Sequence, residues 1–253
     1  MGLVDRIGEG TIRLIMKKMM LLVILLTCFA LTLPASAAGL LPGTPEYESS
    51  LLKDFAHRST LPQSETPRSE WYTARMLNSL WGPMPARYPG IEDTIESLPQ
   101  GTDILAWKRD RVIALAKHYI GLPYRHHHIP AWSPSLPDHP KYNGPGLDCS
   151  NFTAWVYNFG FGIQLNSDVA KQAAMQPRPG FAVHPGMRRI SAEGPFYPGD
   201  ILYIANPNKT AIVHAILFID DGHIIDSTDG QVAVRHFTGW YRRQLSHAIR
   251  VFN

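Results

Sequence analysis

Cysteine is scarce in this sequence. Only Cys28 and Cys149 occur among the 253 residues, and Cys28 lies in an apolar run near the N-terminus. If that run is removed during export, the remaining chain has one thiol and cannot form an intramolecular disulfide. A single thiol in an oxidising compartment is a liability unless the protein uses it, so this scarcity favours a reactive role for Cys149.

Charge is also scarce. Charged residues make up 18% of the chain, with 24 Lys and Arg against 21 Asp and Glu. Residues 1–37 hold four of the basic and two of the acidic residues, which leaves 20 against 19 in the remainder. This balance provides no basic field for nucleic acid, so we expect no nucleic-acid partner. The chain also lacks internal repeats, low-complexity tracts and a second long apolar run.

Residues 1–37 are typical of an export signal. Basic residues precede the apolar run from Met19 to Leu33, and Ala35-Ser36-Ala37 supplies the small residues that signal peptidase requires. The run has 15 residues, fewer than the roughly 20 that span a bilayer as a helix. We therefore predict cleavage and a periplasmic or extracellular location without membrane contact, with an uncleaved anchor as the alternative.

The chain after the signal divides into two predicted parts. Residues 38–101 are rich in proline, which allows only short helices, one of which is expected from Pro67 to Leu80. This extension either packs its aromatic side chains on the main domain, which we favour, or forms a wall of a substrate groove. Residues 102–253 are long enough for one domain with a sizeable core, and we expect it to be the catalytic domain of a monomer.

Helices come first in residues 102–253. Thr102 can cap a helix that Gly121 and Pro123 end, and Asn166 to Asp168 can cap a short helix that continues to Met175. The apolar positions of the first helix share one side; they are Leu105, Val112, Ile113, Ala116 and Ile120.

Strands follow the helices, separated by turn residues. After a loop-rich run from residue 176 to residue 198, the predicted strands cover residues 201–205, 211–219, 223–227, 231–237 and 246–252. Helices followed by a run of strands predict an α+β fold with an antiparallel sheet.

The pattern around Cys149 predicts a further helix. Phe152, Trp155 and Val156 recur at helical spacing after Cys149, and Gly160 is placed to end the helix. The helix would then begin close to Cys149, where free N–H groups favour the nucleophilic thiolate over the thiol. The alternative is a small buried cysteine that packs like alanine.

His214 lies in an expected strand that is apolar on both faces, from Ile212 to Phe218. A polar side chain at such a position needs a partner. That partner is either a backbone carbonyl, as in many buried histidines, or the thiol of Cys149.

The order of four motifs resembles the NlpC/P60 family of cell-wall cysteine peptidases. These motifs are Leu122-Pro123-Tyr124, Gly146-Leu147-Asp148-Cys149-Ser150, Pro198-Gly199-Asp200-Ile201, and His214 within its apolar strand. The resemblance implies a papain-like core with N-terminal helices packed on the sheet, and peptidoglycan peptides as partners. It also implies that Cys149 attacks an amide carbonyl, that His214 transfers the proton, and that Tyr124, Asp148 and Ser150 line the substrate subsites.

Two residues could orient His214 from the next strand. Asp221-Gly222 is a strong hairpin signal, and His223 comes directly after it, near the expected tip. Asp226 is farther along and returns to the level of His214. We therefore predict a catalytic set of Cys149, His214 and Asp226.

Two departures from the family pattern border the groove. Asn151 stands where glycine is usual, and Arg125 with residues His126-His127-His128 stands where Trp-Gly-Gly is common. Adjacent side chains of an extended chain point to opposite faces, so at most His126 and His128 could share an ion, and we predict no metal site and no cofactor. The alternatives are an amidase or acyltransferase with a non-wall substrate, and a non-catalytic wall- or metal-binding module.

Overall fold

The computed structural model describes residues 39–53, 91–126 and 146–253. The export signal and the helix expected from Pro67 to Leu80 lie outside these ranges. The chain forms two compact units, and every helix and strand described below belongs to the unit formed by Leu40–Leu98 and Thr102–Asn253. Within the described ranges, every helix is too short or too polar to cross a bilayer.

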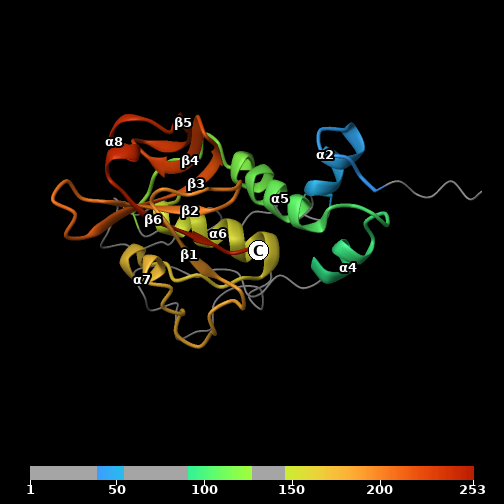
Figure 1. Ribbon diagram of the computed structural model, residues 1–253, viewed down its shortest axis with the longest axis horizontal. Coiled ribbons are helices and arrows are strands. Elements are labelled where there is room, and N and C mark those ends of the chain that lie inside the picture. The colour runs from blue at the N-terminus through green and yellow to red at the C-terminus, as the bar shows by residue number, and fades with distance from the viewer. Residues whose placement is uncertain (1–38, 54–90, 127–145) are drawn as a thin grey trace, which may run out of the picture. The chain divides into compact units, whose positions relative to one another are not determined.

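A six-stranded antiparallel sheet forms the centre of this unit (Figure 1). The strands lie in the order β1-β6-β2-β3-β4-β5. Their bounds are Arg188–Ser191 for β1, Ile201–Ala205 for β2, Ile212–Asp220 for β3, His223–Thr228 for β4, Gln231–His236 for β5 and Leu245–Arg250 for β6. The five expected strands and the α+β class are confirmed, whereas β1 lies in a stretch that we expected to be loop. The exposed arginines of β1 carry no apolar alternation that would mark it as a strand.

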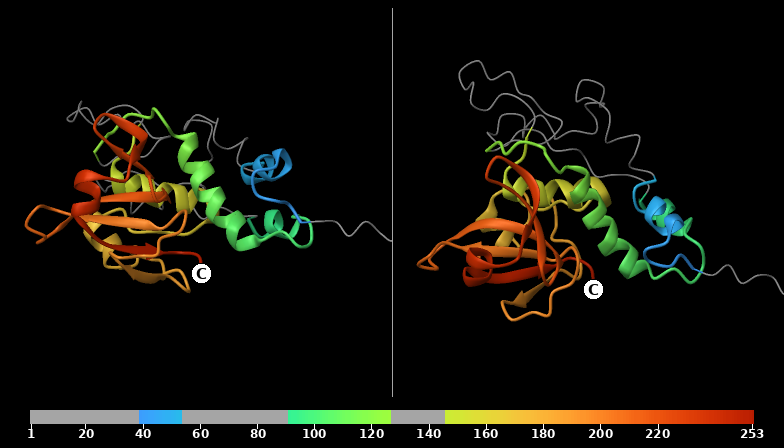
Figure 2. Two further views of the ribbon diagram at one scale, coloured as in Figure 1. Left: turned by 45° about the horizontal axis from the view of Figure 1, so that its top comes forward. Right: turned by 90° about the horizontal axis from the view of Figure 1, so that it is seen from above.

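Six helices accompany the sheet in the described ranges. They are α2 (Pro45–Leu51), α4 (Ile91–Glu96), α5 (Ile104–His118), α6 (Cys149–Phe161), α7 (Val169–Ala173) and α8 (Gly239–Arg243). Helix α6 contacts both α5 and strands β3 and β4, so it lies between α5 and the sheet (Figure 2). The expected packing of N-terminal helices on an antiparallel sheet is therefore confirmed.

The ends of two helices differ from our expectations. Asp103, and not Thr102, caps α5 by accepting a hydrogen bond from the N–H of Ala106, while the Thr102 hydroxyl accepts one from Leu40. Ile120 lies beyond the end of α5 and is exposed.

Helix α6 continues past Gly160 and ends at Gly162, whose φ of 68° is in the left-handed region. Gly160 instead lies where a Cβ atom would come within 3.0 Å of a methyl group of Leu115. This glycine therefore permits the close approach of α5 and α6 and does not end the helix.

Apolar side chains fill both faces of the sheet. On one face, Ala215, Leu217 and Ile225 join the core that includes Phe152 and Val156 of α6. On the other face, a second cluster gathers alternate residues of the same strands; it includes Leu202, Ile204, Ile216, Phe218 and Ile224. This alternation follows from the two-residue period of a strand and explains why β2 to β4 are apolar throughout.

The described part of the extension packs on α5. The Tyr47 hydroxyl donates to a carboxylate oxygen of Asp110 at 2.6 Å, and the Trp107 indole donates to Ser50 at 2.9 Å. Arg111 is fully buried and donates to the carbonyl of Leu51 at 2.5 Å. The N-terminal helix α2 is thus held to the main domain by buried and partly buried polar contacts; the boundary at residue 101 stays a prediction.

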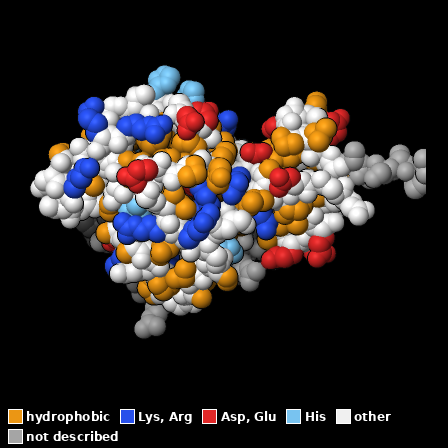
Figure 3. Space-filling view, viewed as in Figure 1, with side chains coloured by type: hydrophobic (Ala, Val, Ile, Leu, Met, Phe, Trp, Pro, Cys, Tyr) orange, Lys and Arg blue, Asp and Glu red, His pale blue; other side chains and the backbone are white. Residues whose placement is uncertain are grey.

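Acidic side chains gather on α2 and α4 (Figure 3). These two helices contain no Lys or Arg, and their acidic residues are Glu46, Glu48, Glu92, Asp93 and Glu96. On the same view, Lys and Arg side chains lie mainly over the part of the molecule that contains α5 and the sheet. The described extension therefore adds an acidic surface to the molecule.

Candidate active site

Cys149 is the first residue of α6. Asp148 caps the helix, because its Oδ1 accepts a hydrogen bond from the backbone N–H of Asn151 at 2.8 Å. The Cys149 side chain is nearly buried, with 8% of its surface exposed. The prediction that a helix begins at this cysteine is confirmed, so the thiol lies at the positive end of the helix dipole.

His214 lies on β3 beside a β-bulge. Ile204 of β2 pairs with His214, but the next residue, Ala205, pairs with Ile212, so Val213 is an extra residue on β3. A bulge bends its strand and changes the direction of nearby side chains. His214 is 6% exposed, whereas Val213 next to it is 45% exposed.

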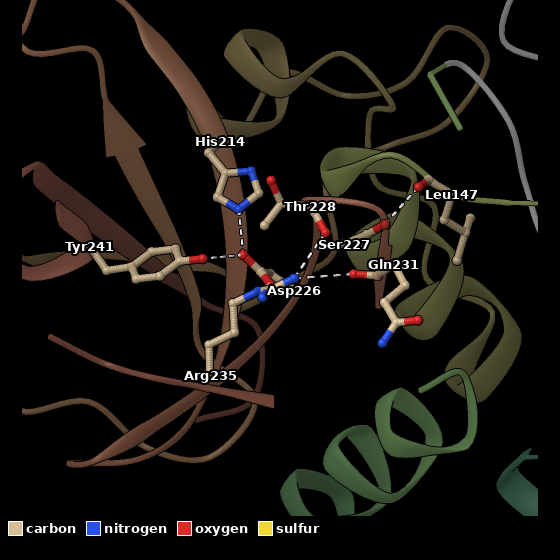
Figure 4. Close-up of polar contacts among 8 residues, drawn as sticks. All are labelled: Leu147, His214, Asp226, Ser227, Thr228, Gln231, Arg235 and Tyr241. Atoms are coloured by element: carbon tan, nitrogen blue, oxygen red, sulfur yellow. Dashed lines mark hydrogen bonds and ion pairs between the residues drawn. The ribbon is translucent and has the colours of Figure 1, made fainter. Parts of the chain in front are cut away.

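The imidazole of His214 is held by Asp226. Its Nε2 lies 2.7 Å from Oδ2 of Asp226, which is fully buried (Figure 4). The β3–β4 hairpin has the expected two-residue turn, since Asp220 pairs with His223 across Asp221 and Gly222. Leu217 pairs with Ile225, so Asp226 comes close to the level of His214, as predicted, and is a diagonal neighbour on the adjacent strand.

The thiol of Cys149 is a second hydrogen-bonding partner of the same imidazole. Burial lowers the pKa of His214, but hydrogen bonds to Asp226 and Cys149 and the charges of both groups raise it to about 9. The structure therefore brings the three predicted catalytic residues together. With a pKa of about 9, the imidazole is protonated at neutral pH. Its partner Cys149 belongs to a residue type whose thiolate form is the nucleophile.

His223 is not part of this cluster. Its Nδ1 lies 2.9 Å from the carboxylate of Asp220, and both side chains are largely exposed at the hairpin tip. This position agrees with the sequence-based choice of Asp226 over His223.

Asp226 has two further partners that the sequence analysis missed. The Tyr241 hydroxyl donates to Oδ2 at 2.9 Å, and Nε of Arg235 donates to Oδ1 at 2.8 Å (Figure 4). Tyr241 belongs to α8, which has no apolar repeat long enough to predict a helix. Arg235 could be placed near Asp226 only from the β4–β5 register, in which Asp226 pairs with Ala233.

The chain before Cys149 is tied to the turn between β4 and β5. The hydroxyl of Ser227 donates to the carbonyl of Leu147 at 2.6 Å, and Tyr124 donates from its backbone to Gly230 at 2.8 Å. Tyr124 also forms a parallel bridge with Leu147. Strand β4 therefore holds His214 through Asp226 and the chain that leads to Cys149 through Ser227.

The three predicted subsite residues surround Cys149 in different ways. Tyr124 is half-buried; burial, followed by the charges of Asp148 and Cys149, raises its pKa to about 12. Asp148 and Ser150 are each 3% exposed, and the Ser150 hydroxyl donates to the carbonyl of Ser167 at 2.6 Å. Asp148 and Ser150 thus make hydrogen bonds within the protein. Contact of all three residues with a substrate stays a prediction.

Asn151 uses the second carboxylate oxygen of Asp148. Its side-chain amide donates to Oδ2 of Asp148 at 3.0 Å, and the residue is fully buried. A glycine at this position would leave that oxygen without this donor. Asn151 thus makes Asp148 a more completely bonded helix cap.

Within residues 39–53, 91–126 and 146–253, no group of three or more His, Cys, Asp or Glu side chains is placed to hold a metal ion. His126 is inside these ranges, whereas His127 and His128 lie outside them.

Comparison with known proteins connects this site to a family. The model of the NlpC/P60 family matches residues 123–251. The chain is 28% identical over 143 residues to gamma-DL-glutamyl hydrolase of Bacillus subtilis, an alignment that covers 56% of this chain and 29% of that protein.

Solved structures of this family are also similar. An NlpC/P60 family protein from Bacillus cereus is 26% identical, with a TM-score of 0.42 and coverage of 57% of this chain and 40% of that one. RipD of Mycobacterium tuberculosis, described as a non-catalytic NlpC/P60 domain protein, is 16% identical, with a TM-score of 0.42 and coverage of 57% and 98%. The chain thus spans less than half of the length of the B. subtilis and B. cereus proteins. Because the family model covers more than half of this chain, the chain belongs to the NlpC/P60 family.

Proposed function

We propose that this protein is an exported cysteine peptidase that hydrolyses amide bonds in the peptide stems of peptidoglycan. The observation that carries the proposal is the arrangement of Cys149 at the start of α6, in hydrogen-bonding contact with an imidazole whose Nε2 is held by a buried carboxylate. These are the nucleophile, the acid–base group and the orienting group of acyl transfer to a thiol.

The reaction would proceed in two steps. The Cys149 thiolate attacks the carbonyl carbon, and as the C–N bond breaks His214 gives its proton to the leaving amine. A water molecule then attacks the thioester while His214 accepts one of its protons, and the C–S bond breaks. The products are an amine and a carboxylic acid, and the enzyme returns to its starting state.

Asp226 serves both steps through His214. Its carboxylate accepts from Nε2, which leaves Nδ1 as the nitrogen that can exchange a proton with the thiol and the reacting groups. The negative charge also stabilises the imidazolium that begins the first step and forms again in the second.

The start of α6 supplies donors for the oxyanion of the tetrahedral intermediate. The backbone N–H groups of Cys149 and Ser150 belong to the first turn, where no carbonyl of the helix can accept from them. In the described part of the chain, the N–H of Asn151 is already bonded to Asp148. The N–H of Cys149 is therefore the best-placed backbone donor beside the nucleophile.

The family and its relatives support the substrate class. One similar structure is described as the NlpC/P60 domain of a peptidoglycan hydrolase, and the curated relative is named for hydrolysis of gamma-DL-glutamyl bonds. An exported protein would meet both kinds of amide bond outside the cytoplasm. We therefore place peptidoglycan peptides first and non-wall gamma-glutamyl peptides second.

Digestion of purified muropeptides by the chain from Ala38 onward, followed by mass spectrometry, tests the proposal. We expect a new amine and a new carboxylic acid from one amide bond with the wild type and no product with Cys149→Ala. Equal product from both proteins would refute a cysteine mechanism. Cleavage of gamma-DL-glutamyl peptides without cleavage of muropeptides would support the second substrate class.

Reactivity of the thiol separates an enzyme from a binding module. An ordinary thiol has a pKa of about 8.5 and is mostly protonated at pH 6. We expect iodoacetamide to alkylate Cys149 at pH 6 much faster than it alkylates free cysteine, because cysteines next to a cationic histidine are generally reactive. Alkylation no faster than that of free cysteine would instead favour a non-catalytic module.

A further inference from the structure

The buried carboxylate of Asp226 is shared by three donors from three different elements. Oδ2 accepts from His214 of β3 and from the Tyr241 hydroxyl of α8, at 2.7 and 2.9 Å. Oδ1 accepts from Arg235 of β5 at 2.8 Å. A carboxylate that also accepts hydrogen bonds from two other groups binds the imidazolium less strongly than a carboxylate whose only partner is the imidazolium.

The guanidinium of Arg235 also fixes the backbone next to Asp226. Its second nitrogen donates to the carbonyl of Thr228 at 2.9 Å and to that of Gln231 at 3.3 Å, on the two sides of the β4–β5 turn. Only a quarter of the Arg235 side chain is exposed. The planar guanidinium therefore links β5, the turn and the carboxylate, and leaves Oδ2 directed at His214.

Charges alternate along the site. Arg235 is a cation, Asp226 an anion and the His214 imidazolium a cation, and Cys149 completes the row as the nucleophile. The charge of Asp229, in the turn after β4, also acts on Arg235 and Tyr241. Arg235 thus opposes the charge that Asp226 presents to the imidazole.

We propose that Arg235 and Tyr241 are positioning residues that direct Asp226 and limit how strongly its carboxylate holds His214, an inference that rests on the proposed function for its catalytic meaning. Neither residue is assigned to donate or accept a proton in the reaction. Their role is to keep the imidazolium acidic enough to release its proton to the leaving amine. Removal of either donor leaves more negative charge for His214.

Titration of His214 by NMR, with ¹³C-labelled histidine in the chain from Ala38 onward, tests this inference without a substrate. The His214 signal is the one that is lost in His214→Gln. In Tyr241→Phe, which keeps the ring and removes only the hydroxyl, we expect the imidazole to bind its proton about three- to tenfold more tightly. In Arg235→Gln we expect an increase of tenfold or more, because a full charge is removed, and in Arg235→Lys a smaller increase.

Matched controls come from similar contacts elsewhere. Tyr47→Phe removes a Tyr–Asp hydrogen bond between α2 and α5, and Arg242→Gln removes an arginine that donates to the carbonyls of Phe237 and Asp221. Neither control should change the His214 titration. Unchanged or weaker proton binding by His214 in folded Tyr241→Phe would overturn the inference, and so would an equal shift in the controls.

Hydrolysis assays separate this inference from the proposed function. If the wild type cleaves muropeptides, Tyr241→Phe should move the alkaline limb of the pH–kcat/KM profile to higher pH, by the same factor as in the NMR titration. A purely structural loss would instead lower kcat/KM at every pH and leave the position of the limb unchanged. If the wild type cleaves no amide substrate, the proposed function fails, and the NMR result still decides whether Arg235 and Tyr241 control His214.

Discussion

Removal of the Asp226 carboxylate is the most informative single change in this protein. Asp226→Ala takes away the acceptor for His214, Tyr241 and Arg235 at once. Asp226→Asn keeps the size of the side chain, removes its charge and replaces one accepting oxygen with an NH₂ donor. The two variants together separate loss of the site from loss of the fold, because removal of one partner of a buried ion pair can cost about 3–5 kcal/mol of stability.

The size of the effect follows from the titration of His214. Burial alone would lower the pKa of this imidazole, yet Asp226 and Cys149 raise it from 6.5 to about 9. A tenfold change in proton affinity corresponds to about 1.4 kcal/mol, so the partners exceed the burial penalty by about 3 kcal/mol. Without Asp226, only Cys149 opposes the burial penalty, and we expect His214 to lose its proton near neutral pH. We therefore expect kcat/KM at pH 7 to fall by about 10²- to 10⁴-fold, the usual contribution of acid–base catalysis.

His223→Ala is the matched control for this prediction. The residue lies on the same strand, and its ring also contacts an aspartate, but that pair is exposed at the hairpin tip. An exposed pair contributes about 0–1 kcal/mol, so we expect kcat/KM to change by less than about twofold.

Initial rates on purified muropeptides at pH 7, together with circular dichroism and urea unfolding, measure both effects. We expect His223→Ala to be active, and Asp226→Ala and Asp226→Asn to be folded and nearly inactive. Folded Asp226 variants within tenfold of wild-type activity, or an inactive and folded His223→Ala, would show that Asp226 is not the orienting residue.

Four further tests address the site and the fold. The alkaline limb of the pH–kcat/KM profile should lie near 9, because His214 must be protonated to act as the acid; a limb at or below 7.5 would contradict this. The same raised pKa stabilises the folded state fully below pH 6.5, and this stability is lost as the pH rises through about 9, so the urea midpoint should fall over that range by more than it does in His214→Gln. Ser227→Ala, which removes the 2.6 Å bond to Leu147, should lower kcat by about tenfold and stability by only about 1 kcal/mol; an unchanged kcat would mean that this bond does not position Cys149. Asp200→Ala should cost about 3–5 kcal/mol in urea unfolding, because Arg250 donates to both of its oxygens in a buried pair, whereas Asp168→Ala, at an exposed helix cap, should cost only about 1 kcal/mol.

Local chemistry made the centre of the site predictable. Apolar residues recur at helical spacing directly after Cys149, so the position of Cys149 at the start of α6 followed from a few neighbouring residues. The two-residue turn at Asp221-Gly222 determined the hairpin length, and this placed Asp226 and not His223 near His214. Both inferences depend on contacts between residues close in sequence.

Helix ends were less predictable, because two or three neighbouring residues could serve equally well in isolation. Asp103 caps α5 because Thr102 is occupied by Leu40, which is 62 residues away. Gly162 ends α6 because Gly160 is needed where α5 passes close to the helix. In each case a contact between distant segments decided the outcome.

The sequence by itself determined the order of helices and strands, the helix start at Cys149 and the hairpin that joins His214 to Asp226. Only the tertiary structure decided how strongly these groups are held. The bulge at Val213, the approach of Arg235 from β5 and the placement of Tyr241 by α8 leave no periodic pattern in the sequence. Such contacts arise from strand register and from packing between segments far apart along the chain, and neither is encoded in the spacing of neighbouring residues.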